Sequence, residues 1–261
     1  MSHYQSVLIT GASSGIGRAL AIACAAPGVV LHLGGRDAAR LSDTAAACRS
    51  RGAEAHARSL DVTDAAGMAE WIAVAGRLDL VIANAGISGG TGRAHAETPE
   101  QTRAIFAVNV DGVLNTVLPA IPAMAAQKPD ASGVRGRIAV VASIAAFIAA
   151  PGAPAYSAAK AAVDRWAVAM AANAAHDGIL LTSVCPGFIR TPMTTDNPYP
   201  MPGLMDADRA AAIILRGVAA GRRRVVFPWW MGLLARAVGS LPPRLVAALA
   251  SRTHGKPPRP D

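Results

Sequence analysis

The sequence predicts an α/β fold of the Rossmann type: a doubly wound parallel sheet in a single domain, with a C-terminal helical extension. Short apolar runs alternate with helix-like segments through most of the 261 residues, and each intervening segment is long enough to form a crossover helix. The first apolar run leads directly into a glycine-rich turn at residues 10–17, and a helix-like segment opens on that turn. This order of strand, turn and helix is typical of the first unit of a doubly wound sheet.

The elements follow one another in a regular order. Six strands are predicted from the pattern, at residues 6–10, 29–34, 54–60, 78–83, 137–142 and 180–185. The segments between them have helical composition and predict helices at residues 16–26, 38–51, 64–75, 99–126 and 155–176. Four prolines, at 192, 198, 200 and 202, then disfavour regular structure. We expect residues 192–209 to form a loop over a ligand site, within a domain at residues 1–225 that precedes apolar helices and a tail at 226–261.

Composition and charge narrow the class of protein. A hydrophobic content of 52% with 16% charged residues indicates a chain that folds around a sizeable core. The net charge of +8 comes mostly from scattered arginines, and an aromatic content of 4% disfavours a nucleic-acid platform. The chain has three cysteines, Cys24, Cys48 and Cys185. Their number is odd and their spacing is not that of metal ligands, so we expect no disulfide framework and no metal site. With no signal-peptide pattern and no apolar run of bilayer length, we expect a cytoplasmic protein.

The glycine-rich turn has the features of a dinucleotide cradle. Gly11, Gly15 and Gly17 follow the first strand, so backbone amides and a helix N-terminus can face a pyrophosphate without an intervening Cβ. Their spacing is G-x-x-x-G-x-G, which differs from the commoner G-x-G-x-x-G fingerprint. Taken alone, the three glycines could simply form a structural turn. Asn84 and Gly86 at the end of the fourth strand make that alternative a poor account of the pattern.

A second group of residues supplies proton-transfer chemistry. Tyr156 and Lys160 are four residues apart in a predicted helix, so both side chains lie on one face. The ammonium is expected to lower the phenol pKa from about 10 toward working pH. Ser143 ends the fifth strand, where its hydroxyl can hold a substrate oxygen in line with the phenol. Each of these residues taken singly can be explained by packing or capping. Taken together with the glycine turn, they predict hydride transfer to a ketone or aldehyde, or the reverse oxidation.

Over about residues 5–225 the chain resembles the short-chain dehydrogenase/reductase family. The resemblance is carried by residues 10–17 and by Asp61, Val62, Asn84, Ala85, Gly86, Asn109, Ser143, Tyr156, Lys160, Pro186 and Gly187. It implies that Asp61 and Val62 flank the adenine, that Asn84 stabilises the central strands, and that Lys160 binds the nicotinamide ribose. It also implies that Asn109 breaks its helix locally and holds a water that relays protons to Lys160. Further implied cofactor contacts are Ser13, Ser14, Ile16, Pro186 and Gly187, with Ile189 and Thr191 at the nicotinamide carboxamide.

The family resemblance further implies a small-molecule carbonyl or alcohol substrate and a homodimer or homotetramer built on helices 99–126 and 155–176. The choice of cofactor rests on residues 34–36 at the end of the second strand, beside the expected adenosine ribose. Gly34 and Gly35 leave room there, and Arg36 can bind a phosphate, which predicts NADP(H) over NAD(H). The alternative is that Arg36 caps a turn and Asp37 binds the ribose. The rival functions are an NAD-dependent alcohol, sterol or sugar dehydrogenase and a cofactor-binding protein without turnover.

The C-terminal region carries two short apolar runs, at residues 228–234 and 245–250, with arginines beside them. Such helices can lie on an anionic membrane surface, close the substrate pocket or pack on a neighbouring subunit. Packing in the core or at an interface is favoured, because apolar helices of soluble proteins are usually buried. Peripheral membrane contact through residues 228–250 is the alternative, and it would favour a lipid-like substrate.

Overall fold

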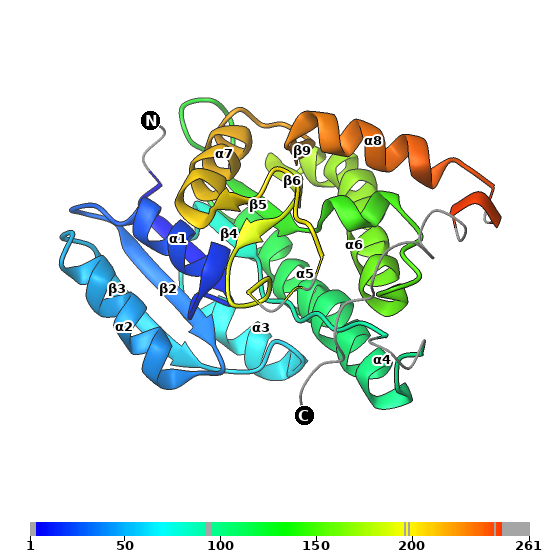
Figure 1. Cartoon of the computed structure of the whole chain (residues 1–261). Helices are drawn as coiled ribbons and strands as arrows, with labels where there is room; N and C mark the ends of the chain where they lie inside the picture. The colour runs from blue at the N-terminus through cyan, green and yellow to red at the C-terminus, as the bar shows by residue number, and fades with distance from the viewer. Residues whose placement is uncertain (1–3, 92–95, 196, 198, 243, 247–261) are drawn as a thin grey trace.

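The computed structural model describes residues 4–91, 96–195, 197, 199–242 and 244–246, and it confirms the predicted fold class. A seven-stranded parallel sheet has the order β3-β2-β1-β4-β5-β6-β9 (Figure 1). The chain builds outward from β1 to β3 and then returns to β4 beside β1, which creates the switch point where such sheets bind ligands. The strands are β1 Ser6–Thr10, β2 Val30–Gly35, β3 Glu54–Ser59, β4 Leu80–Ala83, β5 Gly136–Val141, β6 Ile179–Pro186 and β9 Arg224–Phe227.

Helices cover both faces of the sheet, as buried parallel strands require. One face packs against α1, α2 and α7, and the other against α3, α5 and α6. Every residue of β1 is buried, which explains why the central strands read as continuous apolar runs in the sequence. The helices are α1 Gly15–Cys24, α2 Ala38–Arg49, α3 Ala65–Val74, α4 Pro99–Phe106, α5 Gly112–Ala125, α6 Pro154–His176, α7 Ala207–Ala219 and α8 Trp229–Gly239.

Three predicted boundaries are corrected by the structure. The predicted helix 99–126 is divided into α4 and α5 by a π-helical turn, η1 Ala107–Asp111. The loop expected at residues 192–209 ends earlier, because β8 Met205–Asp206 pairs with β7 Ile189–Arg190 and α7 follows at once. The division expected after residue 225 passes through β9, a seventh strand that the sequence analysis missed and that pairs with β6.

The helical stretch Pro99–Ala125 has the length and apolar composition of a membrane-spanning helix, the one such stretch in the described part of the chain. By length and apolar composition, this stretch therefore contradicts the expectation that no segment of the chain could span a bilayer. Its inner side chains, Val113, Val117 and Ala120 among them, are buried in the core under the sheet.

Candidate functional site

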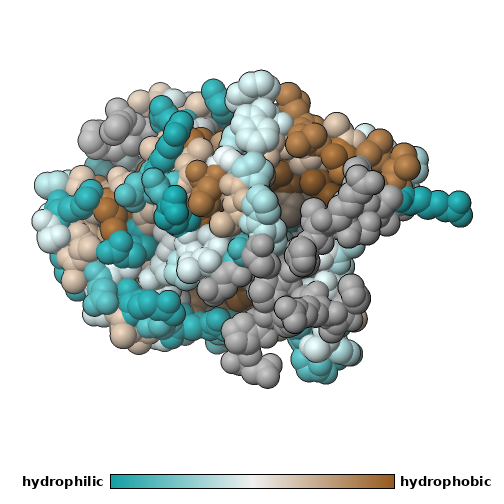
Figure 2. Space-filling model, viewed as in Figure 1, coloured by the Kyte–Doolittle hydropathy of each residue, from teal (hydrophilic) through white to brown (hydrophobic). Residues whose placement is uncertain are grey.

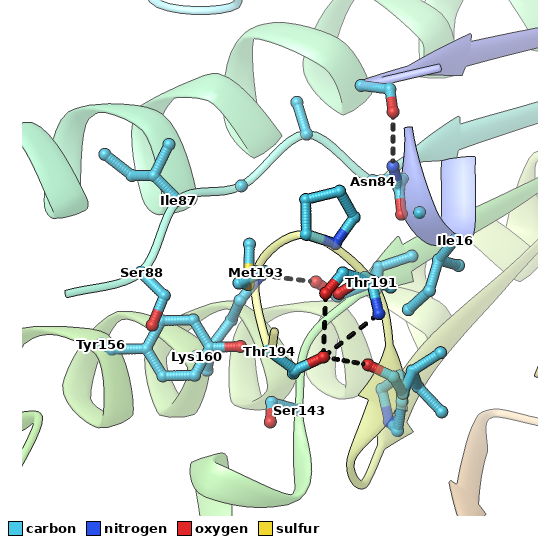
Figure 3. A pocket seen from close by; sticks show the side chains of 18 of the residues that line it. Ile16, Asn84, Ile87, Ser88, Ser143, Tyr156, Lys160, Thr191, Met193 and Thr194 are labelled. Carbon is cyan, nitrogen blue, oxygen red and sulfur yellow. Dashed lines mark hydrogen bonds between the residues drawn. The ribbon is translucent and has the colours of Figure 1, made fainter. Parts of the chain in front are cut away.

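A cavity of about 560 Å³ opens at the carboxyl ends of the central strands. It brings together nearly all of the predicted site residues, although they come from segments far apart in the chain. Those that line it are Gly11, Ser13, Ser14, Gly15, Ile16, Arg36, Asp61, Val62, Asn84, Ala85, Gly86, Ser143, Tyr156, Lys160, Pro186, Gly187, Ile189 and Thr191. Gly17 and Asn109 are not among the lining residues. Figure 3 shows Ile16 and Asn84 at one end of the cavity and Ser143, Tyr156 and Lys160 at the other.

The glycines of the turn are required by backbone geometry and close packing. Gly11 and Gly15 have φ angles of +66° and +52°, a region that residues with a Cβ rarely adopt. A Cβ on Gly11 would lie 2.8 Å from Ala85 Cα, and one on Gly15 would lie 3.0 Å from Thr191 Cγ2. A Cβ on Gly17 would collide with the Gly11 carbonyl, so Gly17 allows α1 to begin against the turn instead of lining the cavity. The turn therefore offers an open backbone surface at the N-terminus of α1, which fits a diphosphate.

Asn84 and Thr10 hold the glycine turn against the end of β4. Asn84 Nδ2 donates to the carbonyl oxygens of Thr10 and Gly11 at 3.0 and 3.2 Å. The Thr10 hydroxyl in turn accepts from the backbone amides of Asn84 and Ala85. These bonds join β1 to β4 across the switch point, which agrees with the stabilising position expected for Asn84.

Two arginines line the cavity near the end of β2: Arg36 directly follows the strand, and Arg40 lies in the first turn of α2. Arg36 is half-exposed, and its Nη1 lies 3.9 Å from Asp61 Oδ2. Asp37 is the N-cap of α2: its carboxylate accepts from the Arg40 backbone amide at 3.0 Å and from Arg40 Nε at 2.6 Å. These bonds hold the pKa of Asp37 below its ordinary value. Arg40 also lines the cavity, and the sequence does not predict this. The rotation of α2 about its axis decides which of its side chains face the cavity, and it is known only from the structure.

The two glycines at the end of β2 have different surroundings from those expected. A Cβ on Gly34 would lie 2.6 Å from Trp71 Cη2, so the indole of α3 fills that space. A Cβ on Gly35 would make only ordinary contact with Ser13. The room expected beside the ribose is therefore at Gly35 alone, and Gly34 serves the packing of Trp71 against the sheet.

The polar side chains at the other end of the cavity lie around the N-terminal part of α6. Lys160 is buried, its Nζ donates to the Val141 carbonyl at 2.8 Å, and it lies 5.9 Å from the centre of the Tyr156 ring. Ser143 follows β5 and caps the short helix η2 Ile144–Phe147, where its hydroxyl accepts from the Ala145 amide at 3.1 Å. Ser143 also lies close enough to Tyr156 to lower the pKa of the phenol. The three predicted groups therefore meet in one place.

The predicted pKa of Tyr156 is wrong for this structure. Burial raises the pKa of the phenol above its ordinary value, Ser143 lowers it in part, and Tyr199 raises it further. Burial also lowers the pKa of Lys160 to about 8. Desolvation disfavours the charged form of both groups, and helical spacing alone does not reveal how deeply they are buried.

Asn109 lies in the π-helical turn η1, so the local break expected in this helix is present. Its side chain is buried and pairs fully with the backbone of Ile87: Oδ1 accepts from the Ile87 amide and Nδ2 donates to the Ile87 carbonyl, both at 2.9 Å. Asn109 therefore fixes the loop after β4 along the cavity. The proton relay through a water at this residue stays a prediction.

Largely apolar side chains from the β7–β8 loop, from the start of α8 and from the segments after β4, η2 and β6 complete the cavity. Those that the sequence analysis did not assign are Ile87, Ile148, Phe188, Met193, Tyr199 and Met231. The Phe188 and Tyr199 rings lie 6.1 Å apart between centroids. Thr194 closes the loop on itself, donating to the Ile189 carbonyl at 2.7 Å (Figure 3). The four prolines marked this loop as irregular, but only the fold shows which side chains enter the cavity.

Comparisons with known proteins agree with this geometry. The family model for short chain dehydrogenases matches residues 5–200. An uncharacterized oxidoreductase of Myxococcus xanthus is 36% identical over 253 residues, covering 95% of this chain and 97% of that protein. A short-chain dehydrogenase from Sphingobium yanoikuyae in complex with NADPH superposes with a TM-score of 0.77 at 26% identity, covering 95% and 96% of the two chains. A 3-ketoacyl-ACP reductase from Sinorhizobium meliloti gives 0.74 at 30% identity, covering 88% and 99%.

The match spans the glycine turn, the three polar residues around α6 and the sheet that joins them. Positive-φ glycines, an open diphosphate cradle and a phenol at the far end of one cavity all fit a pyridine nucleotide. The chain is an NAD(P)-dependent oxidoreductase that acts on CH–OH or C=O groups, and it belongs to the short-chain dehydrogenase family.

Proposed function

We propose that the protein is an NADPH-preferring reductase that converts an apolar or lipid-like ketone or aldehyde to an alcohol, and that it also catalyses the reverse oxidation. The observation that carries the cofactor preference is the pair of guanidinium groups, Arg36 and Arg40, at the end of the cavity nearest β2. Arginine binds phosphate through charge-assisted, often bidentate bonds. Asp37 would favour a ribose hydroxyl, but its carboxylate caps α2 and binds Arg40.

The reaction uses the residues around α6. A bound nicotinamide supplies the hydride or accepts it. The Tyr156 phenol donates a proton to the carbonyl oxygen of the substrate, and Ser143, which lines the same part of the cavity, holds that oxygen in place. When protonated, Lys160 stabilises the phenolate that remains. Val141 fixes the Lys160 ammonium by accepting its hydrogen bond.

The substrate class follows from the lining of the cavity beyond these groups. Phe188, Met193, Tyr199 and Met231 surround the space next to Tyr156 with apolar and aromatic surface, which favours a substrate with an apolar body and a single polar reacting group. The structure of the Sinorhizobium meliloti 3-ketoacyl-ACP reductase supports the carbonyl chemistry. We also propose a homodimer or homotetramer through α4, α5 and α6, because Phe106 and Leu118 remain exposed there.

A screen of carbonyl compounds with NADPH and NADH tests this function. We expect oxidation of NADPH with at least one apolar ketone or aldehyde, and a higher kcat/KM for NADPH than for NADH. The double variant Arg36→Ala, Arg40→Ala should lose about 10- to 100-fold in kcat/KM for NADPH, because it loses charge-assisted bonds to the phosphate, and should change little with NADH.

A matched control is Arg58→Ala, because Arg58 pairs with exposed Glu70 and does not line the cavity. It should leave both rates unchanged. A wild-type preference for NADH would support the NAD-dependent rival and overturn the assignment of the arginines. Binding of either nucleotide without turnover of any compound would favour the non-catalytic rival.

A further inference from the structure

Helix α8 turns its larger apolar side chains outward. Its inner face is made of small residues: a Cβ on Gly232 would collide with Val226 of β9, and one on Gly239 with the Phe147 carbonyl. The outer face carries Trp229, Trp230, Leu233 and Leu234, with exposed fractions of 71%, 40%, 56% and 57%. We call these four residues the α8 face. Figure 2 shows hydrophobic residues gathered over α8 at the surface of the molecule.

The expectation that this region packs in the core is therefore not met for the α8 face. Exposed large apolar residues that cluster on one helix indicate a surface that contacts something else. The inner residues already fix α8 on β9 and η2, since Arg236 stacks on the Phe147 ring with its guanidinium carbon 4.3 Å from the centroid. The outer face is thus not required to hold α8 in place.

The charge of the surrounding sequence identifies the kind of partner. Residues 209–260 contain ten of the 25 Lys and Arg residues of the chain and none of its 17 Asp and Glu residues. Arg236 and Arg244, within and just after α8, are exposed, as are Arg222 and Arg223 before β9. Arg224 differs, because it is paired with buried Asp164. A uniformly basic segment around an apolar, tryptophan-bearing helix face is complementary to an anionic lipid surface.

We propose that the α8 face docks on an anionic lipid bilayer, with Trp229, Trp230, Leu233 and Leu234 at the boundary between headgroups and acyl chains. Tryptophan and leucine favour that depth, and the neighbouring arginines contact the lipid phosphates. A second copy of the chain is a poorer partner for this face. A two-fold symmetric contact places the same residues of both copies together, so it would bring the exposed arginines on either side of α8, Arg222, Arg223 and Arg244, near their own copies, and residues 209–260 supply no acid to pair with them.

Vesicle sedimentation of the intact chain tests the proposal. We expect binding to phosphatidylcholine vesicles that contain phosphatidylglycerol, weak binding to phosphatidylcholine alone, and loss of binding at high salt. Binding should shift the tryptophan emission to shorter wavelength, because two of the four tryptophans, Trp229 and Trp230, are exposed, whereas Trp71 is buried and Trp166 is partly buried. The double variant Leu233→Ser, Leu234→Ser should reduce partitioning at least tenfold, and Val74→Ser, at a 68% exposed position on α3, should leave it unchanged.

The proposal is overturned if the wild-type chain does not sediment with anionic vesicles, or if the α8 variant sediments as well as the wild type. Light scattering identifies the competing outcome: a lower mass for the α8 variant, without vesicle binding by the wild type, would assign this face to a second copy. Turnover of a soluble carbonyl compound by the α8 variant should equal that of the wild type. Failure of vesicle binding would therefore leave the proposed reductase function standing.

Discussion

At the scale of single residues, Tyr156 and Lys160 show how burial sets the chemistry of a catalytic pair. The sequence places them one helical turn apart, and the structure confirms that they lie together. Burial is nevertheless the largest influence on the pKa of each, raising that of the phenol and lowering that of the amine. Both side chains therefore stay neutral over a wider range of pH in the protein than they do in water.

The lowered pKa of Lys160 makes the stability of the protein depend on pH in alkaline solution. A lysine with a pKa of about 8 when folded and 10.5 when unfolded binds fewer protons in the folded state between those values. The free energy of unfolding therefore rises as the pH rises through that window. Below the window, the protein bears the full cost of burying the charged Lys160 ammonium. Neighbouring Cys185, whose pKa is raised to about 12, stays neutral throughout.

We expect Lys160→Met to be stabilised relative to the wild type near neutral pH. Between about pH 7 and about pH 9.5 this advantage should shrink by on the order of 2 kcal/mol, because only the wild type releases a proton. Urea unfolding of the cofactor-free proteins at the two pH values measures it. An advantage that is the same at both would show that the Lys160 pKa is not lowered by folding.

At the scale of elements, an ion pair between a buried carboxylate and a partly exposed arginine joins α6 to β9. Asp164 of α6 is buried, and both of its oxygens accept from Arg224 of β9, at 2.9 and 2.8 Å. Ser183 and Cys185 of β6 donate to the same carboxylate. The pair fastens the edge strand β9, from which α8 continues, to the helix that carries Tyr156 and Lys160.

Removal of Arg224 should be costly, because it leaves a buried carboxylate without its cation. We expect Arg224→Ala to lower the free energy of unfolding by about 3–5 kcal/mol. Arg190→Ala is the control, since the Arg190–Asp206 pair is exposed on both sides and its loss should cost at most about 1 kcal/mol. Denaturant unfolding of both variants measures the difference, and equal costs would contradict a structural role for the Asp164 pair.

Helices and strands with a clear pattern of apolar residues could be predicted from the sequence. Elements defined mainly by their contacts with distant segments could not. The central strands β1 and β4 stand out because both of their faces are buried and their apolar runs are continuous. The edge strand β3 is mostly exposed, so its place in the regular alternation of strands and helices predicts it better than its composition does. Strand β9 was missed because it has four residues and begins with the last of three arginines; only its pairing with β6 makes it a strand. The break at Asn109 is expected from the family resemblance but not from composition, because the segment has a helical composition. In the structure, Asn109 makes a buried contact with Ile87 at this turn.

At the scale of the whole molecule, the site was predictable to the extent that the sheet brings the ends of its strands together. The glycine turn after β1, Asn84 after β4 and Ser143 after β5 converge because parallel strands end on one edge. Arg40, Tyr199 and Met231 were not predictable, because a helix phase, an irregular loop and a C-terminal helix bring them to the cavity. The same limit applies to the proposed substrate, because the loop and the C-terminal helix line the part of the cavity next to Tyr156.

The central claim is that one cavity joins a cofactor cradle to a proton donor at Tyr156. Parallel measurement of NADPH affinity and carbonyl turnover in the wild type and in Tyr156→Phe tests it most directly. We expect the variant to lose about 100-fold or more in kcat, because proton donation is removed, while its affinity for NADPH stays close to that of the wild type. Turnover by Tyr156→Phe at the wild-type rate would contradict the account.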